Sequence, residues 1–178
     1  MARALRVETA GLVRLAQRDL DALFRLILSG ASATEVLNDL LPALVAEYGQ
    51  AGAAVAADWY DQIRDEAAVR GAFRAIPLEA SDRGTSSLIG FALKESKDDA
   101  GLQALLLGGV QRRIADHVRL TVASSSVEDP SAKGWVRVGD GDTCSWCKQY
   151  LDGEVHYIEG YDFPAHDSCG CSTDVVWD

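Results

Sequence analysis

The chain has 178 residues, of which 27 are acidic and 17 basic, so its formal net charge is −10. This acidic balance argues against broad, non-specific binding to nucleic acid, which needs clustered Lys and Arg. The hydrophobic content of 48% is enough for a core and argues against global disorder. The N-terminus lacks the apolar region of a secretory signal, and the longest unbroken apolar run, Ala53 to Ala57, is far too short to span a bilayer. We therefore expect a soluble protein made in a reducing compartment, with no membrane partner.

Two amphipathic helices are expected first. Apolar positions recur at helical spacing over residues 8–28, and Gly30 follows as a C-terminal signal. The segment Ser32-Ala-Thr-Glu35 has the form of a capping box that begins the second helix. Helical spacing then continues to about Val69, and Pro42 inside it should kink or restart the helix. Alanines in the middle of this helix suggest a close helix–helix contact, or simply high helix propensity.

Two further helices are expected after a connector at residues 71–84. A short helix should run through Leu93, and a long one from Leu102 to near Val122. The second half of the long helix carries a basic stripe. It is expected to be a solvated face that complements the helix dipole, or else a contact for an acidic partner or nucleic acid. The stripe consists of Arg112, Arg113 and Arg119.

The spacing of apolar residues changes from helical to alternating after residues 124–130, which contain three consecutive serines and a proline. Alternating or turn-flanked segments then predict short strands at Trp135–Val138, Val155–Ile158 and Thr173–Trp177. The predicted fold class is mainly α, with a long-helix body and a small C-terminal β-rich knob stapled by zinc. The expected division is a helical body at residues 1–123 and a metal-binding module at residues 124–178.

All four cysteines lie in two short knots near the end of the chain. The first is Cys144-Ser-Trp-Cys147, and the second is His166-Asp-Ser-Cys169-Gly-Cys171. A Cys-x-x-Cys turn followed by a His/Cys knot is how a short chain builds a tetrahedral zinc site. Cys144, Cys147 and His166 are the first three predicted ligands, and Cys169 and Cys171 compete for the fourth position.

Two other interpretations of the cysteines are less favoured. Four cysteines also suit two disulfides, but the rest of the chain has no disulfide framework and a histidine stands at ligand spacing. A redox Cys-x-x-Cys would need a thioredoxin-like strand before it and a helix after it. The thiolate-rich donor set favours a structural zinc ion over a catalytic one, which keeps an open position for water.

A catalytic site is not expected, because no nucleophile–base arrangement or phosphate-binding glycine loop is present. His117 lies beside Asp116 and is expected to be a surface or core histidine. His156 is a spare ligand or a packing residue. The enzyme alternative is a zinc-dependent nuclease of the treble-clef kind, and a further alternative is a zinc-ribbon interaction domain without a role in a virion.

Four segments of the chain resemble the MuF-like minor capsid (head morphogenesis) proteins of tailed phages. The likeness covers roughly residues 35–177 and departs from the family within the second knot, where Asp167-Ser168 and Gly170 replace the usual residues and a basic side chain is lost. The segments that carry the resemblance are Tyr48–Ala51 with Ala56–Asp61, Asp129–Arg137, Thr143–Cys147 and His166–Cys171.

The resemblance implies a virion protein present in few copies inside the capsid, near the portal vertex, and assembled in the host cytoplasm. Its role would be head assembly, or packaging and delivery of DNA. The apolar positions from Leu37 to Ile63 exceed what a thin helical body is expected to bury. This segment is therefore predicted to dock on the portal protein, on the inner capsid surface or on another copy of the chain, with direct DNA binding not dominant.

Overall fold

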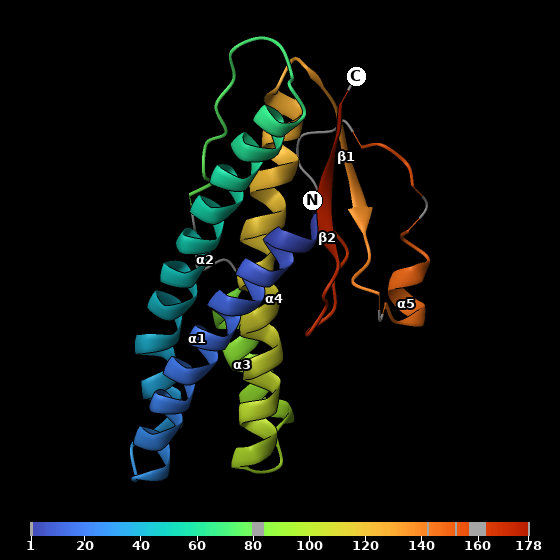
Figure 1. The fold of residues 1–178 in the computed structure, drawn as a ribbon. Coiled ribbons are helices and arrows are strands. Elements are labelled where there is room, and N and C mark those ends of the chain that lie inside the picture. Colours follow the sequence, from blue (N-terminus) through green and yellow to red (C-terminus); the bar gives the residue numbers. More distant parts are fainter. Residues whose placement is uncertain (1, 80–83, 142, 152, 157–162, 178) are drawn as a thin grey trace.

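The structure is a computed structural model that describes residues 2–79, 84–141, 143–151, 153–156 and 163–177. It is mainly helical and ends in a two-stranded antiparallel sheet, which confirms the predicted fold class (Figure 1). The elements in chain order are α1 (Ala2–Leu28), α2 (Ala33–Glu66), α3 (Thr85–Glu95), α4 (Asp99–Glu128), β1 (Ala132–Val138), α5 (Ser145–Lys148) and β2 (Ser172–Trp177).

The helices enclose two hydrophobic clusters. The first is formed where α1, α2, α3 and α4 meet, and its fully buried members include Leu20, Leu41 and Leu106. The second brings Leu5 from α1 together with the second half of α2 and with α4. Strand β2 adds Trp177 to this second cluster, where its ring meets the Tyr60 ring edge-on at 5.5 Å. The C-terminal strand thus shares a core with the helices, and the division at residue 123 stays a prediction.

Helices α2 and α4 pack closely, as the small residues of α2 predicted. A Cβ atom added to Gly49 would lie 2.7 Å from the Nδ1 atom of His117, and one added to Gly52 would lie 2.9 Å from a Val118 methyl group. Ala53 and its neighbours on the same face are buried. Only a backbone without a side chain at these positions lets the two helix axes approach this far.

The predicted helix ends are partly wrong. The Ser32 hydroxyl does accept from the Glu35 backbone N–H at 3.4 Å, which confirms Ser32 as the N-cap of the predicted capping box. However, α2 runs as one helix through Pro42 and ends at Glu66, and α4 continues beyond the expected end. The serine run remains helical because Ser126 donates to the Val122 carbonyl at 2.7 Å, a bond that satisfies the hydroxyl within the helix.

The expectation that Leu37–Ile63 leaves a large apolar surface is wrong. Leu37, Val45 and Ile63 are at most 2% exposed, because the apolar face of α2 lies against α1 and α4. Among the described residues, α2 is also the one helix long and apolar enough to cross a membrane by length and composition, with 39% of that window buried inside the fold. A buried core helix passes the same test.

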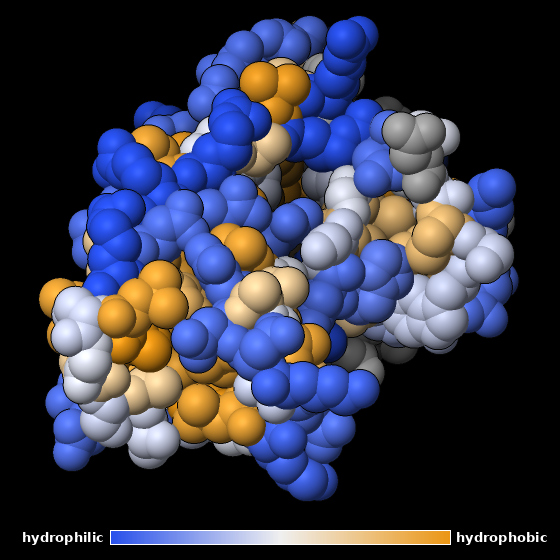
Figure 2. Space-filling view, turned by 90° about the horizontal axis from the view of Figure 1, so that it is seen from below, coloured by the Kyte–Doolittle hydropathy of each residue, from blue (hydrophilic) through white to orange (hydrophobic). Residues whose placement is uncertain are grey.

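The exposed large hydrophobic side chains among the described residues are spread over several elements, and one of them, Leu40, belongs to α2. Leu26, Leu28 and Leu40 lie around the turn between α1 and α2, and are 42–66% exposed. Figure 2 looks at the molecule from this end and shows hydrophobic side chains gathered on one side of the face, beside hydrophilic ones. We call Leu26, Leu28 and Leu40 the apical patch.

The C-terminal sheet pairs β1 with β2, with Trp135 opposite Val175. Two of the three predicted strands are therefore confirmed. The third is reduced to an isolated bridge in which His156 and Trp135 exchange two backbone hydrogen bonds, at 2.8 and 3.1 Å. Residues 157 and 158 of that predicted strand lie outside the described residues. The sheet stands beside the N-terminal end of α1, whose Arg6 donates to the Gly139 carbonyl at 2.6 Å (Figure 1).

Candidate metal centre

The first cysteine pair is positioned by the single turn of α5. Cys144 is the N-cap residue of α5, and its sulfur accepts from the backbone N–H of Cys147 at 3.4 Å. Because Cys147 follows one turn later, both sulfurs are presented on the same side. Cys144 is exposed, whereas Cys147 is buried.

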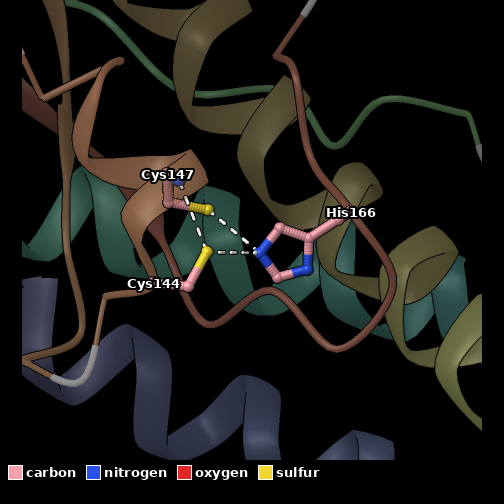
Figure 3. Close-up of side chains that lie close together, drawn as sticks. All are labelled: Cys144, Cys147 and His166. Carbon is pink, nitrogen blue, oxygen red and sulfur yellow. Dashed lines mark hydrogen bonds between the residues drawn. The ribbon is translucent and has the colours of Figure 1, made fainter.

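His166 completes this group from a turn far along the chain. Its Nε2 atom lies 3.2 Å from the Cys144 sulfur and 3.1 Å from the Cys147 sulfur (Figure 3). Its Nδ1 atom lies 2.7 Å from the Asp167 carbonyl oxygen, so Nδ1 carries the proton and Nε2 is left as the ligand atom. The turn is tight, with the Cys169 N–H donating to the His166 carbonyl at 3.2 Å and Ser168 at a φ of 63°.

Cys169 and Cys171 reach the centre through Cys147. The sulfurs of Cys147 and Cys169 are 3.6 Å apart, and the sulfurs of Cys147, Cys169 and Cys171 all lie within 4.8 Å of one another. Cys147 is therefore shared by two groups of three donors. All five predicted ligands are brought together, and none of the four cysteines forms a disulfide.

Three of the separations are close to those expected around a tetrahedral metal ion. With Zn–S of about 2.3 Å and Zn–N of about 2.0–2.1 Å, tetrahedral geometry sets sulfur–sulfur distances of about 3.8 Å and sulfur–nitrogen distances of about 3.6 Å. The observed 3.1, 3.2 and 3.6 Å separations lie within about 0.5 Å of these values. Each group of three donors could therefore hold a metal ion, and Cys147 belongs to both groups.

The two thiols of the first pair differ in acidity. The hydrogen bond from the Cys147 N–H lowers the pKa of Cys144 to about 7, so this thiol ionises near neutral pH. Burial raises the pKa of Cys147 well above its usual value, because the charged thiolate is poorly solvated there. A bound cation would favour the thiolate form of both sulfurs.

One residue of the second knot faces the loop before the first knot. A side chain at Gly170 would collide with the Asp140 carboxylate, because the two segments approach closely at this point. This contact gives a physical reason for a glycine within the second knot, where the sequence departs from the MuF-like pattern.

Two buried arginines surround the centre, and sequence reasoning missed both roles. Arg137, from β1, lies with Nη2 3.5 Å from the Cys147 sulfur and 3.7 Å from the Cys169 sulfur, while Nη1 donates to the Pro164 carbonyl at 2.7 Å. The alternating pattern of β1 placed Arg137 in a strand but gave no sign that it faces thiols.

The prediction that Arg119 belongs to a solvated basic stripe is wrong. This residue is 2% exposed and donates to the backbone carbonyl oxygens of Cys169 and Cys171 at 2.8–2.9 Å, so it anchors the second knot to α4. Its guanidinium also pairs with Asp116 at 2.6 Å. Arg113 is partly buried and donates to the Gly109 carbonyl at 3.0 Å. Arg112 remains on the surface, so the three arginines do not form one solvated face.

The other two histidines lie outside the centre. His117 packs under Gly49, and its Nδ1 atom lies 2.8 Å from the Arg113 carbonyl oxygen. The His156 ring stacks on Trp135 with ring centroids 4.2 Å apart, so the expectation that its strand position favours packing is confirmed.

Comparison with known proteins adds family membership. No curated protein and no solved structure matches the chain. The VG15 protein family matches over residues 1–178. The chain therefore belongs to the VG15 protein family, a family of viral (phage) gene products.

Proposed function

We propose that this phage-encoded protein is a minor structural component of the head, with a C-terminal knot held by a structural zinc ion. One observation carries the proposal: the segments that resemble MuF-like minor capsid proteins coincide with the metal centre and its anchorage. Asp129 begins one such segment and forms a buried ion pair with Arg64 of α2, and Arg137 ends it beside the sulfurs. The other two segments of the tail supply the five donors.

Zinc is the ion that this donor chemistry favours. Thiolate and imidazole ligands suit zinc, whereas magnesium and calcium prefer oxygen ligands. We assign Cys144, Cys147, His166 and Cys169 as the four ligands, because the Cys169 sulfur lies 3.6 Å from the sulfur shared by both groups. Cys171 then remains a thiol at the edge of the shell.

A structural role is favoured over a catalytic one. Five donors are more than enough to close a four-coordinate shell, and three of them are buried. A cavity of about 240 Å³ borders the second knot, but its lining, which includes Gln17, Gln111 and Ser172, contains no carboxylate or imidazole among the described residues. General acid–base chemistry most often uses such a group, so the nuclease alternative is less favoured.

The partner contact is proposed at the apical patch. The buried face of α2 does not supply it, whereas Leu26, Leu28 and Leu40 are exposed. Hydrophobic side chains also gather on part of the face that Figure 2 shows. Exposed apolar groups beside polar ones are typical of protein interfaces. We propose that this end contacts the portal protein or the inner capsid surface, and that the protein resides inside the virion after assembly in the host cytoplasm.

The test compares phage particles that carry the natural gene with particles that carry Leu28→Asp. Mass spectrometry of purified, nuclease-treated particles should detect the natural protein, and Leu28→Asp should reduce its incorporation strongly. The control is Val7→Asp, at an exposed position on α1 away from the apical patch, which should enter normally. Absence of the natural protein from particles would overturn the head role. Equal incorporation of all three proteins would overturn the contact only.

A further inference from the structure

The guanidinium of Arg137 is a buried charge beside the sulfurs of the metal centre. The residue is 7% exposed, and among the described residues no carboxylate lies within ion-pair distance of it. Within the part of the chain that the structure describes, its buried Nε atom has no hydrogen-bond partner. A buried charge without compensation is strongly destabilising, so a fold that keeps Arg137 here favours a negative group beside it.

The neighbours of Arg137 identify that negative group. Its Nη2 atom faces the sulfurs of Cys147 and Cys169 at 3.5 and 3.7 Å. Neutral thiols would not compensate the charge, whereas metal-bound cysteines are thiolates. The aromatic ring of Phe163 covers the guanidinium with its centroid 4.0 Å away, which orients the group but leaves the charge unpaired.

The second buried arginine, Arg119, contacts backbone oxygens of the second knot instead of sulfurs. Arg119 touches the same knot, but through the carbonyl oxygens of Cys169 and Cys171. Its guanidinium also contacts the Asp116 carboxylate at 2.6 Å, and Arg112 shares this carboxylate at 3.6 Å. Among the described residues, Arg137 is therefore the buried arginine that contacts the sulfurs and has no carboxylate partner.

We propose that Arg137 is the counter-charge of the metal centre, and that it matches a divalent ion held by three thiolates and one neutral imidazole. Such a shell carries a single net negative charge, which one guanidinium neutralises. A shell of four thiolates would carry two negative charges and leave one unbalanced. This inference rests on the proposed zinc site, and it makes Arg137 a positioning residue that stabilises the loaded centre without binding the ion.

Cobalt(II) titration of the reduced, full-length chain tests the proposal, because thiolate coordination gives Co²⁺ visible and near-ultraviolet absorption bands. We expect Arg137→Met to weaken metal affinity about 10–100-fold, the range found when outer-shell partners of metal ligands are removed. Arg137→Lys keeps a positive charge and should lose less. The control is Arg6→Met, which removes a guanidinium that contacts the Gly139 carbonyl near the knots but no sulfur, and should leave the affinity unchanged.

The outcomes separate the inference from the site on which it rests. Arg137→Met binding Co²⁺ as tightly as the natural chain, with helical circular dichroism intact, would overturn the counter-charge role and leave the metal site standing. The charge-transfer intensity of the natural chain should correspond to three thiolates, and an intensity for four would overturn the charge count even if Arg137→Met failed to fold. No cobalt binding by the natural chain would instead refute the metal site itself.

Discussion

Replacing Asp129 by Ala should destabilise the whole fold, because it removes the partner of a buried cation. The Arg64 Nε atom donates to the Asp129 carboxylate at 2.8 Å, and the two side chains are 6% and 0% exposed. The same carboxylate accepts from the Tyr60 hydroxyl at 3.3 Å and from the Ser131 backbone N–H at 3.0 Å. Arg64 would keep only backbone carbonyl acceptors, including that of Gly71 at 2.9 Å.

Breaking a buried pair from one side costs about 3–5 kcal/mol, because the remaining charge stays buried. For a chain of this size each kcal/mol lowers the melting temperature by about 2–4 °C, so Asp129→Ala should melt about 6–20 °C lower. Asp129→Asn keeps hydrogen-bonding capacity without the charge, so its melting temperature should lie between those of the natural protein and Asp129→Ala. The matched control is Glu95→Gln, which removes the exposed pair with Lys94 and should cost less than about 1 kcal/mol.

The assay is urea unfolding followed by far-ultraviolet circular dichroism, at a fixed zinc concentration for every variant. The double variant Arg64→Met with Asp129→Leu removes both charges and should recover much of the loss. The reasoning fails if Asp129→Ala costs no more than Glu95→Gln. It also fails if the double variant is as unstable as the sum of its two single changes, because the charges would then act independently.

Three further predictions concern the metal, the pH and the helix contact. Chelation of the ion should unfold the tail around Cys144, since structural zinc supplies roughly 10–16 kcal/mol of apparent binding energy in small peptides; unchanged near-ultraviolet circular dichroism after complete metal removal would contradict this. Burial and the neighbouring Asp129 raise the pKa of Tyr60. Above about pH 10 the folded state therefore keeps a proton that the unfolded state loses. The free energy of unfolding should then fall by about 1.4 kcal/mol per pH unit. Tyr60→Phe should flatten that slope in urea titrations between about pH 9 and 11, and an identical slope would refute the assignment. Gly49→Ala should destabilise the protein because the added Cβ atom would lie 2.7–3.0 Å from the His117 ring. The control is Gly90→Ala, which has open space around it and should stabilise α3 by up to about 1 kcal/mol. Equal changes in melting temperature would show that α2 and α4 adjust freely.

The helices and the clustering of the cysteines with His166 were predictable because they depend on short-range patterns. The spacing of apolar residues in α1 and the Ser32–Glu35 capping box are local signals, and both agree with the structure. Cys144 and Cys147 stand at ligand spacing in one turn, so their convergence needed no knowledge of the rest of the fold. The partner His166 was identifiable because few other residues in the tail offer a nitrogen ligand.

The features that sequence reasoning missed depend on how the tail packs on the helices. Arg119 has the spacing of a surface residue, and only the docked second knot buries it. Ser126 is a turn-forming residue by composition, yet its bond to the Val122 carbonyl keeps α4 helical. Leu37 belongs to an apolar stripe that is covered because α1 and α4 both lie against α2, which the stripe alone does not specify.

The sharing of one core by the two ends of the chain constrains how the protein is made. Leu5 reaches full burial in a cluster that Trp177 completes, and Arg6 binds the carbonyl of Gly139, 133 residues later. Contacts this distant in sequence form slowly, because a long loop must close before they stabilise anything. During translation, α1 therefore keeps part of its apolar face uncovered until β2 has left the ribosome. Nascent chains stalled before residue 170 should therefore remain sensitive to protease at α1.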